Sequence, residues 1–143
     1  MAHILIADDE AIVRQLYGAA FESAGHTVGL VADGDEALEA LGARSVDLLV
    51  LDWMMPRVSG FEVMRRLRLS AQHCRLPVIM LTMRTGLQDR SIAENALVDL
   101  LFSKSSAPDW LVYQAEQLMI EKARVAPVAP MPWQQRRVVR YSC

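Results

Sequence analysis

Five short apolar runs recur along the chain, separated by longer segments of mixed polarity. The runs are Ile4–Ala7, Thr27–Val31, Leu48–Leu51, Val78–Leu81 and Leu100–Phe102. Three of them, read as His3–Ala7, Val46–Leu51 and Pro77–Leu81, are nearly continuous instead of alternating between apolar and polar. Strands that are buried on both faces have this pattern. We therefore predict five strands of a parallel sheet that is covered by helices.

The segments between these runs carry apolar residues at helical spacing. We predict that each of three sets shares one helix face: Ile12, Leu16, Ala19 and Ala20; Phe61, Met64 and Leu67; and Leu111, Ala115, Leu118 and Met119. The residues 88–98 give a further helix on the spacing of Ile92, Ala93, Ala96 and Leu97. Strands that alternate with helices in this way predict an α/β doubly wound fold, with a five-stranded parallel sheet and five helices.

Capping signals agree with this division. Asp33 and Ser59 each stand three residues before a glutamate, which is the spacing of a helix N-terminal capping box. Pro108 suits the first turn of the last helix, and Gly25 and Gly42 stand where the preceding helices are expected to end.

The length and composition of the chain indicate one domain that can bury a hydrophobic core. It has 143 residues, of which 52% are hydrophobic and 22% charged, so global disorder is excluded. Residues 1–123 hold 11 basic and 17 acidic side chains, for a net charge of −6, whereas residues 124–143 hold four arginines and no acid. We predict a folded body over residues 1–121 and a Pro/Arg-rich tail over residues 122–143, with Trp133 and Tyr141 packed on the body or on a neighbouring chain.

The N-terminal apolar run reaches Asp8 too soon for a signal peptide, and no uncharged apolar run approaches the length that spans a bilayer. The expected location is therefore the cytoplasm. The acidic body also makes nucleic-acid binding unlikely as a general property, unless the basic tail or an output domain supplies it.

The residues that end the strands are the candidates for chemistry, because ligands of parallel α/β sheets bind beyond the carboxyl ends of the strands. The first strand ends in Asp8 and Asp9, the third in Asp52, the fourth in Thr82 and the fifth in Lys104. Two carboxylates about 4 Å apart repel each other by roughly 4 kcal/mol at an effective dielectric constant near 20. Three such groups need a cation, and an all-oxygen set with few protein ligands suits Mg²⁺.

A magnesium ion beside a carboxylate, with a lysine and a hydroxyl nearby, meets the needs of phosphoryl transfer to that carboxylate. The sequence does not indicate a dinucleotide-binding site or a phosphate-binding P-loop, because the chain contains neither GxGxxG after its first strand nor GxxxxGK[ST].

Four segments resemble the receiver domain of two-component response regulators. They are ILIADDE (Ile4–Glu10), LDWMMPRVSG (Leu51–Gly60), the MLT that ends at Thr82 and the FSK that ends at Lys104. The resemblance covers residues 1–121 and implies a flavodoxin-like fold with strand order 2-1-3-4-5.

The same resemblance implies a role for each strand-end residue. Asp52 would be the phosphoacceptor. Asp9, Asp52 and the backbone carbonyl of Met54 would bind Mg²⁺ directly, with Asp8 acting through water. Thr82 and Lys104 would bind the phosphoryl group, and Thr82 would shift toward it. The donor would be a histidine kinase or a histidine phosphotransfer protein, and catalysis would be limited to the chain's own phosphotransfer and dephosphorylation.

Three positions depart from the family pattern. Ser105 replaces the proline that usually follows the lysine, so we predict a trans peptide bond there and a reshaped loop. Leu101 replaces the switch aromatic, and Phe102 is expected to face the other side of the strand. Met83 replaces a small residue, and we hypothesise that its side chain shields the acyl phosphate from water and slows its hydrolysis.

Several functions remain open from the residues. The chain is read first as a stand-alone receiver that signals by binding an unknown protein target or by relaying phosphate, with a homodimer as a further possibility. It also fits the receiver part of a longer transcriptional regulator, or a degenerate receiver that only binds partners. A hydrolase with Asp52 as nucleophile would need a further carboxylate two residues later, where Met54 stands.

Overall fold

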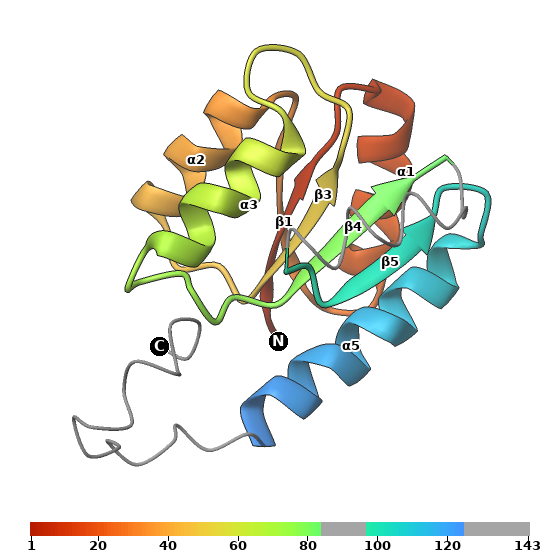
Figure 1. Cartoon of the computed structure of the whole chain (residues 1–143). Coiled ribbons are helices and arrows are strands. Elements are labelled where there is room, and N and C mark those ends of the chain that lie inside the picture. The colour runs from red at the N-terminus through yellow and green to blue at the C-terminus, as the bar shows by residue number, and fades with distance from the viewer. Residues whose placement is uncertain (84–96, 125–143) are drawn as a thin grey trace.

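The computed structural model describes residues 1–83 and 97–124. Strands and helices alternate along these residues (Figure 1). The strands are β1 (His3–Ala7), β2 (Thr27–Val31), β3 (Leu48–Asp52), β4 (Val78–Thr82) and β5 (Leu100–Ser103), and the helices are α1 (Ala11–Ser23), α2 (Gly34–Ala43), α3 (Gly60–Leu69) and α5 (Pro108–Arg124). The helix predicted at residues 88–98 falls largely outside the described residues, as do Trp133 and Tyr141 of the tail.

All five strands are parallel and lie in the order β2-β1-β3-β4-β5, which confirms the predicted doubly wound sheet. Helices α1 and α5 cover one face of the sheet, and α2 and α3 cover the other (Figure 1). The strand order reverses between β1 and β3, so the carboxyl ends of these strands flank the position where such folds bind ligands.

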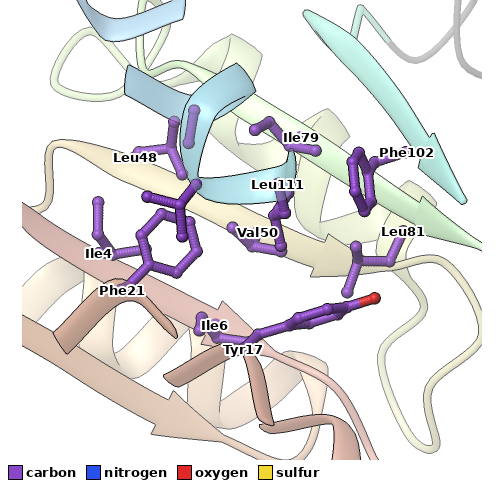
Figure 2. Packing of buried hydrophobic residues seen from close by; sticks show 12 residues of the cluster. Ile4, Ile6, Tyr17, Phe21, Leu48, Val50, Ile79, Leu81, Phe102 and Leu111 are labelled. Atoms are coloured by element: carbon purple, nitrogen blue, oxygen red, sulfur yellow. The ribbon is translucent and has the colours of Figure 1, made fainter. Parts of the chain in front are cut away.

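Successive residues of β1 enter different cores. Ile4 and Ile6 pack with Tyr17 and Phe21 beneath α1 and α5 (Figure 2), whereas Leu5 and Ala7 pack on the α2 and α3 side. All five residues of β3 and of β4 are buried. This explains the continuous apolar runs, because a strand covered on both faces has no solvent-facing position to alternate with.

The apolar set predicted to share one face of α1 is mostly not on the buried face of that helix. Ile12 and Leu16 are exposed, and the helix instead buries Tyr17, Gly18 and Phe21. Tyr17 and Phe21 are one helical turn apart, and their rings bury more apolar area than the aliphatic side chains could. Of the other two predicted faces, Phe61 is half-exposed, while Met64, Leu67, Leu111 and Ala115 are buried.

The helix boundaries follow the capping signals. The Glu36 N–H donates to Asp33 Oδ1 at 2.8 Å, and the Glu62 N–H donates to Ser59 Oγ at 3.3 Å. Gly25, which follows the C-cap Ala24 of α1, adopts a φ of 93°, in the region that glycine tolerates best. Helix α2 extends one residue past Gly42, to Ala43, because the glycine there keeps an ordinary helical conformation.

Candidate functional site

The strand ends bring the predicted residues together at one edge of the sheet. A cavity of about 660 Å³ lies there, lined by Asp9, Glu10, Asp52, Trp53, Met54, Met80, Leu81, Thr82, Met83 and Lys104. Register explains the gathering, since Asp52 pairs with Leu81 and Thr82 pairs with Ser103, the residue before Lys104. Asp8 follows the last residue of β1 and is completely buried, while Asp9 is exposed.

Lys104 is the cation around which the acidic groups are arranged. Its Nζ lies 2.9 Å from Asp8 Oδ2, 3.2 Å from Glu10 Oε1 and 3.4 Å from Asp52 Oδ1. Its own backbone is fixed on two sides, because its N–H donates to the carbonyl of Thr82 at 2.9 Å and its carbonyl accepts from the Tyr17 hydroxyl at 3.4 Å. The lysine head is thus held by the fold, and is not a freely solvated charge.

Glu10 was missed by the sequence analysis. The Glu10 N–H donates to Asp8 Oδ1 at 2.8 Å, which turns the chain after β1 and carries the Glu10 side chain to Lys104. The signal that could have found it is the aspartate two residues earlier, because an aspartate side chain commonly accepts from the backbone N–H two residues on.

Burial and charge shift the ionisation of these groups. Burial, with the nearby charge of Asp8, raises the pKa of Asp52 to about 7, against the opposing effects of Lys104 and of the Met54 N–H, which donates to Asp52 Oδ1 at 3.3 Å. Burial also raises the pKa of Asp8, although Lys104 opposes it. Burial would lower the pKa of Lys104, but its contact with Asp8 and the charges of Asp52 and Asp8 outweigh that effect and raise it.

The acidic groups fit a divalent cation. Asp8 Oδ2 is fully buried and, despite its ion pair with Lys104, has no partner in hydrogen-bonding geometry within the described part of the chain. Asp8, Asp9 and Glu10 can each place one carboxylate oxygen within 4.8 Å of the others. An all-oxygen set of this kind suits a hard cation such as Mg²⁺. Asp52 and Met54 line the same cavity, and the Met54 N–H donates to Asp52 Oδ1.

The three departures have structural outcomes. Every peptide bond in residues 1–83 and 97–124 is trans, as predicted for Lys104–Ser105. The Ser105 N–H, which a proline would lack, donates to Ser103 Oγ at 3.3 Å, and the two Ser hydroxyls are 2.7 Å apart. Phe102 is buried beneath α1 and α5 (Figure 2), while Leu101 is half-buried and does not belong to that core. Met83 is exposed and lines the cavity.

The strand order and the site define a flavodoxin-like α/β protein. Its acidic residues line a cavity at the carboxyl ends of the strands, where the strand order reverses and where such folds bind ligands. The family model of the response regulator receiver domain matches residues 4–116, and the chain belongs to this family.

Relatives and solved structures agree with this assignment. The response regulator MprA of Mycobacterium ulcerans is 37% identical over 116 residues, which are 81% of this chain and 49% of that protein. The phosphate regulon transcriptional regulatory protein PhoB of Rhizobium meliloti is 46% identical over 81 residues, 57% of this chain and 36% of that protein. The chemotaxis response regulator CheY4 of Vibrio cholerae superposes with a TM-score of 0.78 at 28% identity, over 82% of this chain and 98% of that one.

The chain therefore spans half or less of the length of these two curated relatives. No helix within the described residues combines the length and the apolarity needed to cross a bilayer.

Proposed function

We propose that this chain accepts a phosphoryl group on Asp52 from a histidine kinase or a histidine phosphotransfer protein. The observation that carries the proposal is the position of Lys104 Nζ, 2.9 Å from Asp8 and 3.4 Å from Asp52, at a strand edge that also presents Thr82. This arrangement has one fixed positive charge beside the candidate nucleophile and a threonine in the lining of the same cavity.

In the proposed reaction an Asp52 carboxylate oxygen attacks phosphorus as the phosphorus–nitrogen bond of a phosphohistidine breaks. The electron pair of that bond stays on the imidazole nitrogen, and an acyl phosphate remains on Asp52. Lys104 faces Asp52 and pairs with one phosphoryl oxygen, while the Thr82 hydroxyl donates to another. The chain's own phosphotransfer and dephosphorylation are the only catalysis that we propose.

Asp8, Asp9 and Asp52, with the Met54 backbone carbonyl, would hold Mg²⁺ in this proposal. When bound, Mg²⁺ would neutralise the carboxylates and the incoming phosphoryl oxygens. Asp8 supports this part of the proposal, because its carboxylate is completely buried at the acidic edge and can bring an oxygen within 4.8 Å of those of Asp9 and Glu10. Glu10 belongs to the same acidic cluster and would act from the solvent-exposed side of that cluster.

Protein partners would dock beside this cavity. Ile12 and Leu16 are exposed apolar residues on α1, the helix that follows Asp9 and Glu10. Ile12 and Leu16 are one helical turn apart, so together they offer apolar contact area to a protein partner. We propose that the donor approaches over this helix, and that phosphorylation changes the binding of a protein target in the cytoplasm.

A second candidate function follows from the relatives. The PhoB relative is a transcriptional regulatory protein of which this chain matches 36%, so the chain could serve as the receiver part of such a regulator. In that case the output would be transcription, and the phosphoryl chemistry at Asp52 would be the same.

The test is incubation with a small phosphodonor and Mg²⁺, read by intact mass, with Asp52→Asn as the control. We expect an adduct of one phosphoryl mass on the wild-type chain that is absent from Asp52→Asn and from samples with excess chelator. An adduct that persists in Asp52→Asn would place the acceptor elsewhere. The absence of any adduct at every Mg²⁺ concentration would favour a degenerate receiver that only binds partners.

A further inference from the structure

The methionine side chains of residues 1–83 and 97–124 range from fully buried to largely exposed, with Met55 and Met119 in between. Met64 and Met80 are 0% and 1% exposed in the core, whereas Met54 and Met83 are 77% and 75% exposed. Among the methionines of residues 1–83 and 97–124, only Met1 at the chain terminus is more exposed than these two. Single exposed apolar side chains are common on protein surfaces, so what distinguishes Met54 and Met83 is that they border the same cavity.

Both exposed methionines belong to the cavity that contains Asp52. Met54 stands two residues after Asp52 and its N–H donates to Asp52 Oδ1 at 3.3 Å, while Met83 directly follows Thr82. We call Met54 and Met83 the thioether lip. Its two members extend from the two chain segments that hold the candidate acceptor and the candidate phosphoryl-binding hydroxyl.

Exposed thioethers are open to oxidation in a way that the core methionines are not. In the reaction with hydrogen peroxide, a sulfur–oxygen bond forms and the peroxide oxygen–oxygen bond breaks. The sulfur gives up two electrons, and the second peroxide oxygen leaves as water. The product, methionine sulfoxide, is polar and is reversible by methionine sulfoxide reductases.

We propose that the thioether lip is an oxidation site through which peroxide controls the lifetime of the phosphoryl group on Asp52. The effect on lifetime rests on the proposed function, whereas the identity of the oxidised residues does not. In the reduced state two apolar side chains border the acyl phosphate and limit the approach of water. In the oxidised state each side chain carries a strong hydrogen-bond acceptor that recruits water to the same border.

The consequence concerns hydrolysis, in which water attacks phosphorus, the bond from phosphorus to the Asp52 oxygen breaks, and inorganic phosphate leaves. A wetter border supplies that nucleophile more readily. We expect oxidation to shorten the phospho-Asp52 half-life by roughly threefold. The phosphorylated state would then have a shorter lifetime at a higher peroxide concentration, with no change in the phosphoryl donor.

The first experiment maps oxidation in the folded full chain. Peroxide is added under native conditions and sulfoxide formation at each methionine is followed by peptide mass spectrometry. Met64 and Met80 serve as buried controls and Met1 as an exposed reference. We expect Met54 and Met83 to oxidise about tenfold or more faster than the buried pair and at rates comparable with Met1. Rates for Met54 and Met83 that match the buried pair would overturn the proposal.

The second experiment measures the half-life of the phosphorylated chain before and after oxidation, in wild type and in the Met54→Leu/Met83→Leu double variant. Leucine keeps an apolar side chain of similar volume, so the variant retains the fold and the lip but cannot form the sulfoxides. We expect oxidation to shorten the half-life in wild type and to leave it unchanged in the variant. Reductase treatment is expected to restore the wild-type value.

Two results would contradict the effect on lifetime. One is an unchanged half-life in oxidised wild type, and the other is an equal shortening in the double variant, which would assign the effect to other methionines such as Met1. If the reduced chain cannot be phosphorylated on Asp52 at all, the proposed function fails, and the oxidation map still decides whether the thioether lip is the oxidised site.

Discussion

Asp52 carries the largest electrostatic cost of the site when its side chain is ionised. Its side chain is almost fully buried beside Asp8, and burial with that neighbouring charge raises its pKa from 3.8 to about 7. The folded protein therefore binds a proton on Asp52 more tightly than the unfolded chain does. The stability gained from that proton is fully present below pH 4 and is lost as the pH rises through about 7.

Replacing Asp52 by asparagine removes this loss, because the amide has a similar shape and no charge. In the presence of chelator we expect Asp52→Asn to exceed wild type in free energy of unfolding by on the order of 2 kcal/mol at pH 8, and by little at pH 4. Denaturant titration at both pH values is the measurement. Glu39→Gln, on the exposed face of α2, is the matched control and is expected to show no such dependence. A difference between Asp52→Asn and wild type that stays constant with pH would refute the explanation.

Met83 tests the shielding of the acyl phosphate at the level of one side chain. Truncation to alanine opens the cavity border next to Thr82, so we expect the phospho-Asp52 half-life to shorten by about two- to fivefold. Loss of the phosphoryl group is followed by intact mass. Leu69→Ala is the control, since Leu69 is equally exposed but does not line the cavity. An unchanged half-life in Met83→Ala would remove the hypothesis.

At the scale of secondary-structure elements, the start of helix α2 lies in close contact with the loop that follows β3. A Cβ atom added at Gly34, the first residue of α2, would lie 2.1 Å from the backbone oxygen of Val58. Val58 belongs to residues 53–59, the loop that carries Met54 away from Asp52. The start of α2 therefore sets the position of a loop that borders the cavity.

Two alanine substitutions in this one helix are expected to change the free energy of unfolding in opposite directions. Gly34→Ala forces the loop backbone to move and should lower the free energy of unfolding by about 1–3 kcal/mol. Gly42→Ala meets nothing within 4 Å, and should raise it by about 0.5–1 kcal/mol through helix propensity. Thermal or denaturant unfolding of both variants checks the pair. Equal effects would show that the approach to Val58 does not constrain the loop.

Sequence reasoning succeeded for elements whose pattern is local. The buried strands and the caps at Asp33 and Ser59 follow from residues that are neighbours in the chain. It failed for the inner face of α1, where Ile12 and Leu16 have the right spacing but Tyr17 and Phe21 fill the space beneath the helix. Which of two apolar stripes is buried depends on what the sheet presents to the helix, and no local pattern contains that information.

The same distinction applies to the site. Asp9, Asp52, Thr82 and Lys104 could be placed at one edge because parallel strands share a direction. Glu10 was missed because its side chain reaches Lys104 only through the turn that Asp8 makes after β1, and that turn had to be recognised first. The roles of these residues in phosphoryl transfer stay predictions until the adduct on Asp52 is measured.

For the whole molecule, the crowded acidic edge predicts a response to magnesium. A ligand that binds only the folded state adds stability as its concentration exceeds its dissociation constant, about 2.7 kcal/mol at a hundredfold excess. We expect Mg²⁺ to raise the melting temperature by several degrees and to change the fluorescence of Trp53, which lines the cavity. Asp9→Asn should weaken both responses. Potassium chloride at matched ionic strength is the control, and flat signals with Mg²⁺ would contradict a metal site.

The ammonium group of Lys104 gives the protein a counterion of its own. Because that charge is attached to the chain and already lies among Asp8, Glu10 and Asp52, the fold does not depend on a dissolved ion to offset all the repulsion at this edge. When divalent ions are depleted, we therefore expect the protein to lose its proposed ability to accept a phosphoryl group while it remains folded. That ability should return as soon as the ion is added back.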